Sequence, residues 1–307
     1  MYPSKILVFG EYTILLNSNA LAVPYNRFYG ELAFMDEDTD KERIEPIRSN
    51  KSLKEFLKSS RTGNKNQKLT YTLDFETFEK DLENGLYFKS DIPEESGLGS
   101  SGALIAAFFD KYANIRTSDR DILKIRNCLA LLESFYHGLS SGIDPLVSYL
   151  KSPLLIKDNK IYRIFNPPIE ELLQKYGLFL VHGQRSGKTG VLVNDFNNKC
   201  KSDPEYLNKI QKRYIPVNNE CITLLMSINN SKSFFSAIRK ITLLQLEIFN
   251  ELIPEKLIPL TNYGLENNLF YLKLCGSGGG GYFLGFTNNI IQTECYFNEM
   301  GYKILVY

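Results

Sequence analysis

A run of small residues between Pro93 and Ala103 has the composition of a ligand-binding loop. Pro93-Glu94-Glu95-Ser96-Gly97-Leu98-Gly99-Ser100-Ser101-Gly102-Ala103 contains three glycines and three serines, and the pattern of a buried helix follows it. Glycine has no Cβ and lets the backbone approach a ligand, while serine caps a helix start. The free N–H groups and positive dipole end of that helix would then face the loop, where phosphate is the natural occupant. From these residues alone, a serine-capped loop before a core helix is an equal alternative.

A second candidate segment runs from Glu133 to Asp144, where two carboxylates flank another loop of small residues. Glu133 stands near the end of a helical apolar pattern, His137-Gly138 closes that helix, and Asp144 stands at the entry of the next one. Taken singly, each has an ordinary explanation: Glu133 on a solvated helix face, His137 at a helix end and Asp144 as an N-cap. These alternatives stay open.

Two further glycine-containing segments lie in the second half of the chain. Gly183-Gln184-Arg185-Ser186-Gly187-Lys188-Thr189 looks like a Walker P-loop but has three residues between its glycines, where that motif needs four. Arg185 and Lys188 are candidates to bind a substrate carboxylate, with exposed loop residues as the alternative. Gly276-Ser277-Gly278-Gly279-Gly280-Gly281 separates two strand patterns and has more glycines than a hairpin connection requires.

The composition is that of an ordinary globular protein. The chain has 307 residues, 43% of them hydrophobic, and a net charge of +1, which favours two domains and asks for neither nucleic acid nor an anionic membrane. Its five cysteines form no C-x-x-C pair and predict free thiols in a reducing cytoplasm. No apolar run is long enough for a membrane span, and the N-terminus enters a strand pattern too early for a signal peptide.

The elements that must position these residues alternate between strands and helices. In the first half we expect strands at 5–9, 13–16, 20–24, 29–34, 69–73 and 86–90. We expect helices at about 52–58, 100–112, 118–136 and 145–150, and a hairpin formed by 153–156 and 160–164. Asn166-Pro167-Pro168 is the best linker. Beyond it we expect helices at 169–176, 203–212, 217–228 and 232–250, and strands at 178–181, on both sides of the glycine run and at 302–307.

The first loop resembles the phosphate-binding signature of the GHMP small-molecule kinases, P-x-x-x-G-L-G-S-S, with Gly102 where the family usually has alanine. In that family the loop wraps the triphosphate of ATP and a serine reaches Mg²⁺. The resemblance therefore implies a phosphate loop that binds ATP through Pro93, Gly97, Leu98, Gly99, Ser100, Ser101 and Gly102.

Two other segments resemble the mevalonate kinases in particular, and a third resembles a further signature of the GHMP family. Glu133 to Asp144 resembles E-x-x-x-H-G-x-x-S-G-x-D, with Ser140 where proline is common, which implies Glu133 and Ser101 as Mg²⁺ ligands and Asp144 as catalytic base. Lys5 takes the place of the active-site lysine in the first signature, where Glu11 matches the usual acid and Tyr12 replaces a histidine. The third signature, K-L-T-G-A-G-G-G-G, has Cys275 and Ser277 as its departures. The implied substrate-binding residues are Glu11, Tyr12, Ser141, Gly142, Arg185, Gly276, Ser277 and Gly278.

The resemblance implies a two-domain α+β fold, with a ribosomal-protein-S5-domain-2-like domain over 1–166 and a ferredoxin-like α/β domain over 167–307. It implies ATP-dependent, Mg²⁺-assisted phosphorylation of a small-molecule alcohol, mevalonate first, in a cleft between the domains. Tyr12 is common in bacterial phosphomevalonate kinases, so phosphomevalonate and sugar kinases are the enzyme alternatives. A binding protein that lost catalysis is the non-enzyme alternative. We expect a cytoplasmic protein without nucleic acid or membrane partners, and a homodimer is left open.

Overall fold

The computed structural model describes residues 1–36, 44–63, 70–115, 121–138, 140–165, 168–184, 189–227, 231–276 and 278–307, with only the backbone of Thr62, Gly63, His137 and Thr189. The chain divides into two compact units, neither of which is one continuous stretch. Unit 1 comprises Met1–Lys5, Pro24–Pro93 and Gly99–Ser152, and unit 2 comprises Ile6–Val23, Glu94–Leu98 and Pro153–Tyr307. The predicted boundary at residue 166 stays a prediction, and Asn166 and Pro167 lie outside the described residues.

Unit 1 is built around a helical core. Two strands, β1 (Tyr2–Phe9) and β2 (Ala20–Phe34), have residues in both units. The other elements of unit 1 are α1 (Ile44–Gly63), β3 (Thr72–Leu73), α2 (Phe75–Glu83), β4 (Leu86–Ser90), α3 (Ser100–Tyr112), β5 (Ala113–Asn114), α4 (Ile122–His137) and α5 (Ile143–Leu150).

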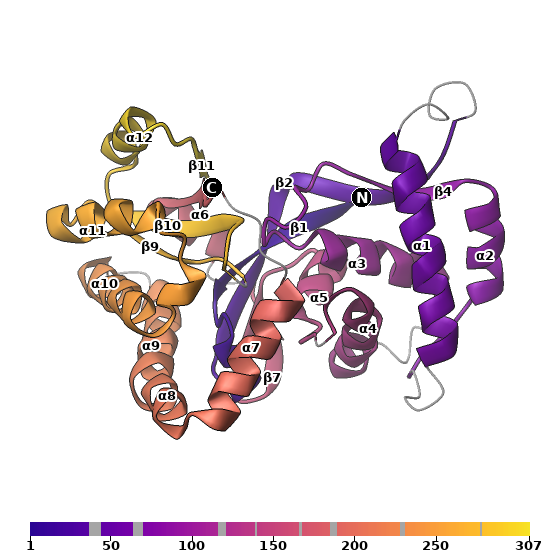
Figure 1. Cartoon of the computed structure of the whole chain (residues 1–307), viewed down its shortest axis with the longest axis horizontal. Helices are drawn as coiled ribbons and strands as arrows, with labels where there is room; N and C mark the ends of the chain where they lie inside the picture. The colour runs from indigo at the N-terminus through magenta and orange to yellow at the C-terminus, as the bar shows by residue number, and fades with distance from the viewer. Residues whose placement is uncertain are drawn as a thin grey trace. The chain divides into compact units, whose positions relative to one another are not determined.

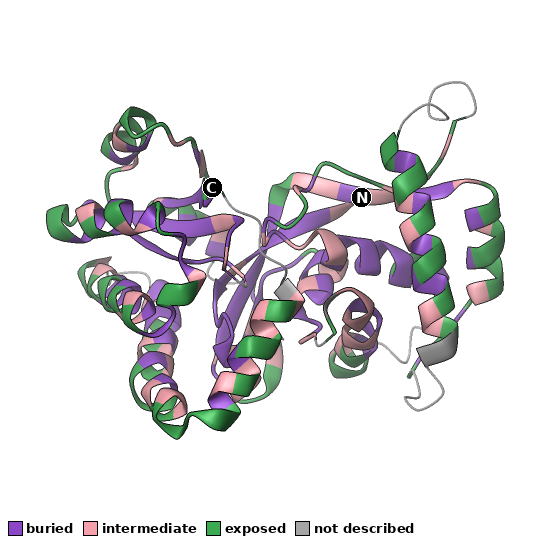
Figure 2. Cartoon of the chain, in the orientation of Figure 1, coloured by how far each residue is buried: buried purple, intermediate pink, exposed green. Residues whose placement is uncertain are grey.

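The helix α3 is the centre of that core. It packs against both α4 and α5, which lie beside it in Figure 1. Figure 2 shows α3 buried over most of its length, whereas α1 and α2 alternate buried and exposed residues. Phe108 of α3 meets Phe56 of α1 and Phe78 of α2 edge to face, with ring centroids 5.1 and 4.8 Å apart. The helix α3 is therefore in contact with α1, α2, α4 and α5.

Unit 2 contains a second sheet with its own helices. Its elements are η1 (Thr13–Leu16), β6 (Leu154–Lys157), β7 (Lys160–Arg163), α6 (Ile169–Lys175), β8 (Leu178–His182), α7 (Thr189–Ser202), α8 (Pro204–Lys209), η3 (Ile210–Tyr214), α9 (Ile215–Leu225), α10 (Ser231–Ile248), η4 (Asn250–Leu252), α11 (Leu257–Asn267), β9 (Phe270–Leu274), β10 (Tyr282–Thr287), α12 (Ile290–Glu299) and β11 (Ile304–Val306). The four-stranded antiparallel sheet has the order β11-β8-β10-β9. The helices α10 and α11 pack on β9.

The first sheet joins strands from distant parts of the sequence. Its path is β1-β2-β6-β7, and β4 pairs with β2 in register Gly30 to Ser90. The predicted hairpin forms as β6–β7, and within unit 2 it pairs with β2 through Ala20–Ala22. None of the helices that the structure describes is long and apolar enough to cross a membrane.

Several predicted elements differ from the structure. The strand expected at 13–16 is the 3₁₀-helix η1, because a sharp turn at Tyr12 lets its N–H groups bond locally, as Ile14 N does to Gly10 O at 3.0 Å. The strands expected at 20–24 and 29–34 are one strand, β2, and only Thr72–Leu73 of the strand at 69–73 forms. The helices expected on either side of Pro216 are continuous in the structure, because the π-helical turn η3 connects α8 to α9 and Pro216 lies in the first turn of α9.

Candidate active site

A buried lysine pairs with an accessible carboxylate in unit 1. Lys5 lies in β1 and Asp144 in the first turn of α5, and the distance from Nζ to Oδ2 is 2.7 Å. The lysine side chain is 3% exposed, while that of Asp144 is 30% exposed. Asp144 is not the N-cap of its helix: Gly142 holds that position with φ 73°, a conformation that glycine adopts without strain. The carboxylate is therefore fixed on one side by Lys5 and open on another.

A second carboxylate lies beside this pair. Glu133 of α4 is buried and accepts hydrogen bonds from the hydroxyls of Ser101, at 3.3 Å, and Ser140. Burial, and next the charge of Asp144, raises the pKa of Glu133 to about 7, against the lowering effect of Ser140, Lys5 and Ser101. A buried carboxylate and a serine hydroxyl are oxygen donors that suit a hard divalent cation, whose charge would offset the repulsion between Glu133 and Asp144. The residues present thus fit Mg²⁺.

Ser140 contacts Glu133, although the sequence by itself assigned it no role. Its hydroxyl donates to Glu133 and also accepts from the backbone N–H of Gly142, at 2.9 Å. It thereby ties the α4 carboxylate to the N-cap of α5. The one signal in the sequence is the departure itself, a hydroxyl where the resembling motif commonly has a proline. Arg126 Nε also donates to Ser141 O at 2.6 Å, which secures the same loop.

The glycines of the phosphate loop (93–102) allow close contacts within unit 1. Gly99, with φ 80°, is the N-cap of α3, so the predicted serine cap is wrong at this position. A Cβ on Gly99 would lie 2.8 Å from Cγ of Lys5, and one on Gly102 would lie 3.0 Å from the carbonyl carbon of Asp144. The loop end, the lysine and α5 approach one another this closely only because these residues lack side chains. The helix expected over 118–136 corresponds to α4, which Asp121 caps, while residues 118–120 lie outside the described residues.

Residues 94–98 of the phosphate loop belong to unit 2, where they contact the glycine loop (276–281). Gly97 has φ 81°, and a Cβ there would lie 2.7 Å from the carbonyl oxygen of Cys275. Tyr282 N donates to Ser96 O at 2.9 Å, and a Cβ on Gly281 would lie 2.7 Å from that same oxygen. At Gly97 and Gly281, glycine is therefore required by backbone-to-backbone packing between the two loops.

The structure divides the predicted site residues between the units. Those in unit 1 are Lys5, Pro93, Gly99, Ser100, Ser101, Gly102, Glu133, Ser141, Gly142 and Asp144. Those in unit 2 are Glu11, Tyr12, Gly97, Leu98, Gly276 and Gly278. Arg185, Lys188 and Ser277 lie outside the described residues. The roles assigned to all of them stay predictions.

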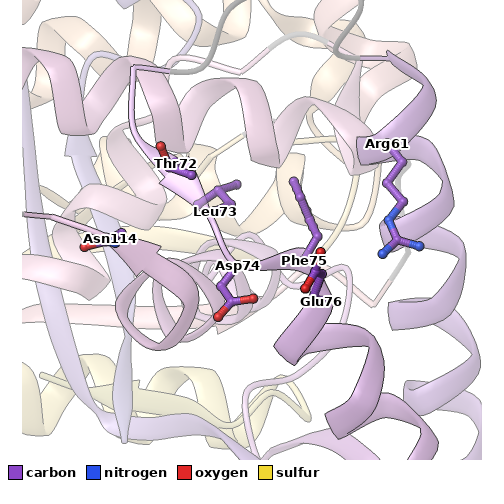
Figure 3. A pocket seen from close by; sticks show the side chains of 7 residues that line it. All are labelled: Arg61, Thr72, Leu73, Asp74, Phe75, Glu76 and Asn114. Atoms are coloured by element: carbon purple, nitrogen blue, oxygen red, sulfur yellow. The ribbon is translucent and has the colours of Figure 1, made fainter.

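A pocket in unit 1 has no part in this arrangement. Figure 3 shows it, a hollow of about 510 Å³ lined by Arg61, Thr72, Leu73, Asp74, Phe75, Glu76 and Asn114. Two of its charged side chains already have partners: Arg61 forms a two-pronged pair with Glu79, and Asp74 caps α2. We therefore assign no chemistry to this pocket.

Comparison with known proteins bears on the same residues. Residues 67–152, which include the phosphate loop, Glu133 and Asp144, match the model of the GHMP kinases N terminal domain. The mevalonate kinase of Pyrococcus abyssi (strain GE5 / Orsay) is 25% identical over 295 residues, 91% of this chain and 85% of that protein.

Solved structures share the fold. A crystal structure of mevalonate kinase superposes with a TM-score of 0.65 at 22% identity, over 99% of this chain and 96% of that one. Streptococcus pneumoniae phosphomevalonate kinase in complex with phosphomevalonate and AMPPNP gives 0.58 at 14% identity, over 100% and 98%. At these identities the likeness establishes fold alone, and it confirms the predicted two-domain α+β architecture.

Proposed function

We propose that this chain, whose residues 67–152 match the GHMP kinases N terminal domain, is a kinase that phosphorylates mevalonate with ATP. The observation that carries the proposal is the group formed by Lys5, Ser101, Glu133 and Asp144 in unit 1. One carboxylate of this group is accessible to an acceptor and the other is buried among hydroxyls. Mevalonate is the substrate named for the relative that aligns with 91% of the chain.

Asp144 is the proposed base. The acceptor hydroxyl oxygen forms a bond to the γ-phosphorus, the bond from that phosphorus to the β–γ bridging oxygen breaks in line, and the hydroxyl proton passes to the Asp144 carboxylate. Lys5, 2.7 Å from Asp144, holds this carboxylate in place and offsets negative charge on the phosphoryl group. Because phosphoryl transfer needs alignment more than covalent help, two fixed side chains suffice for this role.

Ser101 and Glu133 are the proposed holders of Mg²⁺. When bound, the ion neutralises charge on the phosphate oxygens. The Ser140 hydroxyl keeps the Glu133 carboxylate oriented, because it bonds the carboxylate and the N-cap of α5 together. The backbone of Gly97–Ser101 and the dipole of α3 bind the phosphates of ATP.

Replacement of the proposed base tests the mechanism. Asp144→Asn should lower kcat by roughly 10²–10⁴-fold, because the amide cannot accept the proton, while the Kd for ATP changes by less than about threefold. Coupled ADP release gives kcat, and calorimetric titration gives the Kd. Asp121→Asn is the matched control, because asparagine caps a helix as well as aspartate and Asp121 only caps α4. Near-normal turnover by Asp144→Asn would overturn the assignment.

The acceptor is tested with the same assay. We expect ADP release with mevalonate and none above background with phosphomevalonate or galactose. Turnover with phosphomevalonate alone would favour the alternative suggested by Tyr12, and turnover with galactose alone would favour a sugar kinase. The cytoplasmic location and the homodimer stay predictions.

A further inference from the structure

A completely buried ion pair in unit 2 lies outside the group described above. Lys273, in β9, contacts Glu11, and the side chains of both are 0% exposed. Lys273 Nζ also donates to the carbonyl oxygen of Leu274 at 2.7 Å and lies 5.4 Å from the ring centroid of Phe9. A lysine withdrawn from water requires such partners, because the free energy of burying an unpaired charge is large. The pair therefore holds β9 and residue 11 in a single arrangement.

The end of β9 is held by a second buried side chain. Gln245 of α10 accepts from Leu274 N at 2.7 Å through Oε1, and its Nε2 donates to the Tyr214 hydroxyl at 2.7 Å. Both backbone polar groups of Leu274 are thus bonded to buried side chains, one from Lys273 and one from Gln245. Leu274 is two residues before Gly276, where the glycine loop begins.

The turn that presents Glu11 is strained. Tyr12 has φ 59° and ψ −46°, and Thr13 N donates to Glu11 O at 2.5 Å, which together define a γ-turn with positive φ. A tyrosine in this conformation is an outlier that the surroundings must enforce. Its ring is buried against Phe196 and Phe249, with centroids 4.9 and 5.9 Å away. The N–H of Gly10 is bonded to Asn218 Oδ1 at 3.0 Å.

The glycine loop in turn supports the phosphate loop inside unit 2. Gly97 packs on the carbonyl of Cys275, and the Ser96 carbonyl accepts from Tyr282 N at 2.9 Å. A displacement of Leu274 would move the adjacent Cys275, whose carbonyl group contacts Gly97, and would thereby shift residues 96 and 97. Packed interiors transmit such displacements because they have few voids to absorb them.

We infer that Glu11 and Lys273 are positioning residues: their buried pair, reinforced by the strained turn at Tyr12, fixes the end of β9 and thereby, within unit 2, the glycine loop and residues 96 and 97 of the phosphate loop. The sequence predicts that Glu11 contacts the acceptor, whereas its complete burial beside Lys273 favours a role in holding Lys273 and β9 in place. The inference rests on the proposed function for its kinetic consequence, and on the contacts within unit 2 for its structural one.

The experiment compares Glu11→Gln, Lys273→Met and the double variant with the wild type. Amide hydrogen exchange at Leu274 and Tyr282 should accelerate at least tenfold in each single variant, and KM for ATP should rise at least fivefold. The double variant should lose less than the product of the single effects, because it leaves no unpaired buried charge. The exposed pair Glu205–Lys209, changed to Gln and Met, is the matched control and should alter neither readout.

Each result has a defined meaning. Unchanged exchange at Leu274 and Tyr282 in Glu11→Gln would overturn the inference, as would a rise in acceptor KM alone. If Lys273→Met does not fold, the double variant provides the comparison, and its recovery of the fold supports the pair. Exchange is measured without any substrate, so a failure of the proposed function, seen as no turnover by the wild type with any alcohol, is distinguishable from a failure of this inference.

Discussion

At the scale of single residues, the chemistry of this chain depends on what burial does to carboxylates. Asp144 keeps an exposed face beside Lys5, whereas Glu133 is buried and its charge is opposed by that of Asp144. Two carboxylates close together in the same unit thus have different environments, and one is suited to accept a proton while the other is suited to a cation. Ser140, the charge of Lys5 and Ser101 lower the pKa of Glu133 and so oppose the effect of its burial.

The raised pKa of Glu133 predicts a pH-dependent stability. In the folded protein the pKa is about 7, above the ordinary value of 4.5, so the folded state binds more protons than the unfolded one between these values. Stability without metal should therefore fall as pH rises from about 4.5 to 7. Glu133→Gln should be more stable than the wild type at pH 8 by roughly 1–3 kcal/mol and equal to it at pH 4.

Urea denaturation in EDTA at pH 4 and pH 8 measures this difference. The control is Glu83→Gln, on the exposed surface of α2, which should change stability at neither pH. Added Mg²⁺ should stabilise the wild type but not Glu133→Gln. Equal stability of Glu133→Gln and wild type at pH 8 would show that the buried carboxylate is not a source of destabilisation.

At the scale of elements, the two glycine-rich loops contact each other at positions where a side chain would clash with neighbouring backbone. Gly97 combines a left-handed φ of 81° with a neighbouring carbonyl 2.7 Å from the position of a Cβ. Gly301 has φ 76° with no atom within 4 Å of that position. Alanine substitutions at these two glycines therefore separate two free-energy costs. One is the cost of the left-handed conformation, roughly 1–2 kcal/mol for a residue with a Cβ, and the other is the cost of the steric contact.

We predict that Gly97→Ala raises KM for ATP by about tenfold or more and lowers Tm further than Gly301→Ala does. The added methyl group must displace the Cys275 carbonyl and with it the glycine loop. Gly301→Ala should lower Tm alone and leave KM unchanged. Equal Tm losses and an unchanged KM in both variants would mean that the contact at Gly97 relaxes without consequence. Thermal unfolding and steady-state kinetics provide both readouts.

At the scale of the whole molecule, the chain is divided into units that are discontinuous in sequence. Unit 2 takes Ile6–Val23 and Glu94–Leu98 from the first third of the chain, and these segments supply Glu11 to Lys273 and Gly10 to Asn218. A cut at the predicted boundary would separate these partners. The predicted boundary therefore marks a linker, and we do not expect it to divide the chain into two parts that fold independently.

We therefore predict that the fragment 167–307 does not unfold cooperatively on its own. An unpaired Lys273 in the interior would destabilise it by about 3–5 kcal/mol, a large share of the stability of a domain. Circular dichroism during thermal unfolding is the measurement, since the chain has no tryptophan. Co-expression with fragment 1–166 should restore a cooperative transition. A cooperative transition of 167–307 alone, at the temperature of the intact chain, would contradict the prediction.

The sequence by itself determined the features that depend on short stretches of chain. The helix over 100–112, the strand over 86–90 and the hairpin near 154–163 form as predicted, because periodicity and turn residues act locally. The apolar run at 13–16 was misleading, because its conformation depends on the turn at Tyr12, which buried rings and the Glu11–Lys273 pair support. The π-helical turn before Pro216 likewise has no local signal.

The tertiary structure alone decided which charged and polar groups meet. Glu11 and Lys273 are 262 positions apart, and no spacing rule connects them. The bond from Ser140 to Glu133 and the exposure of Asp144 also arise only when α4 and α5 pack together. The reason is physical: the ionisation and orientation of a side chain depend on the dielectric and the donors around it, and folding brings those from remote parts of the chain.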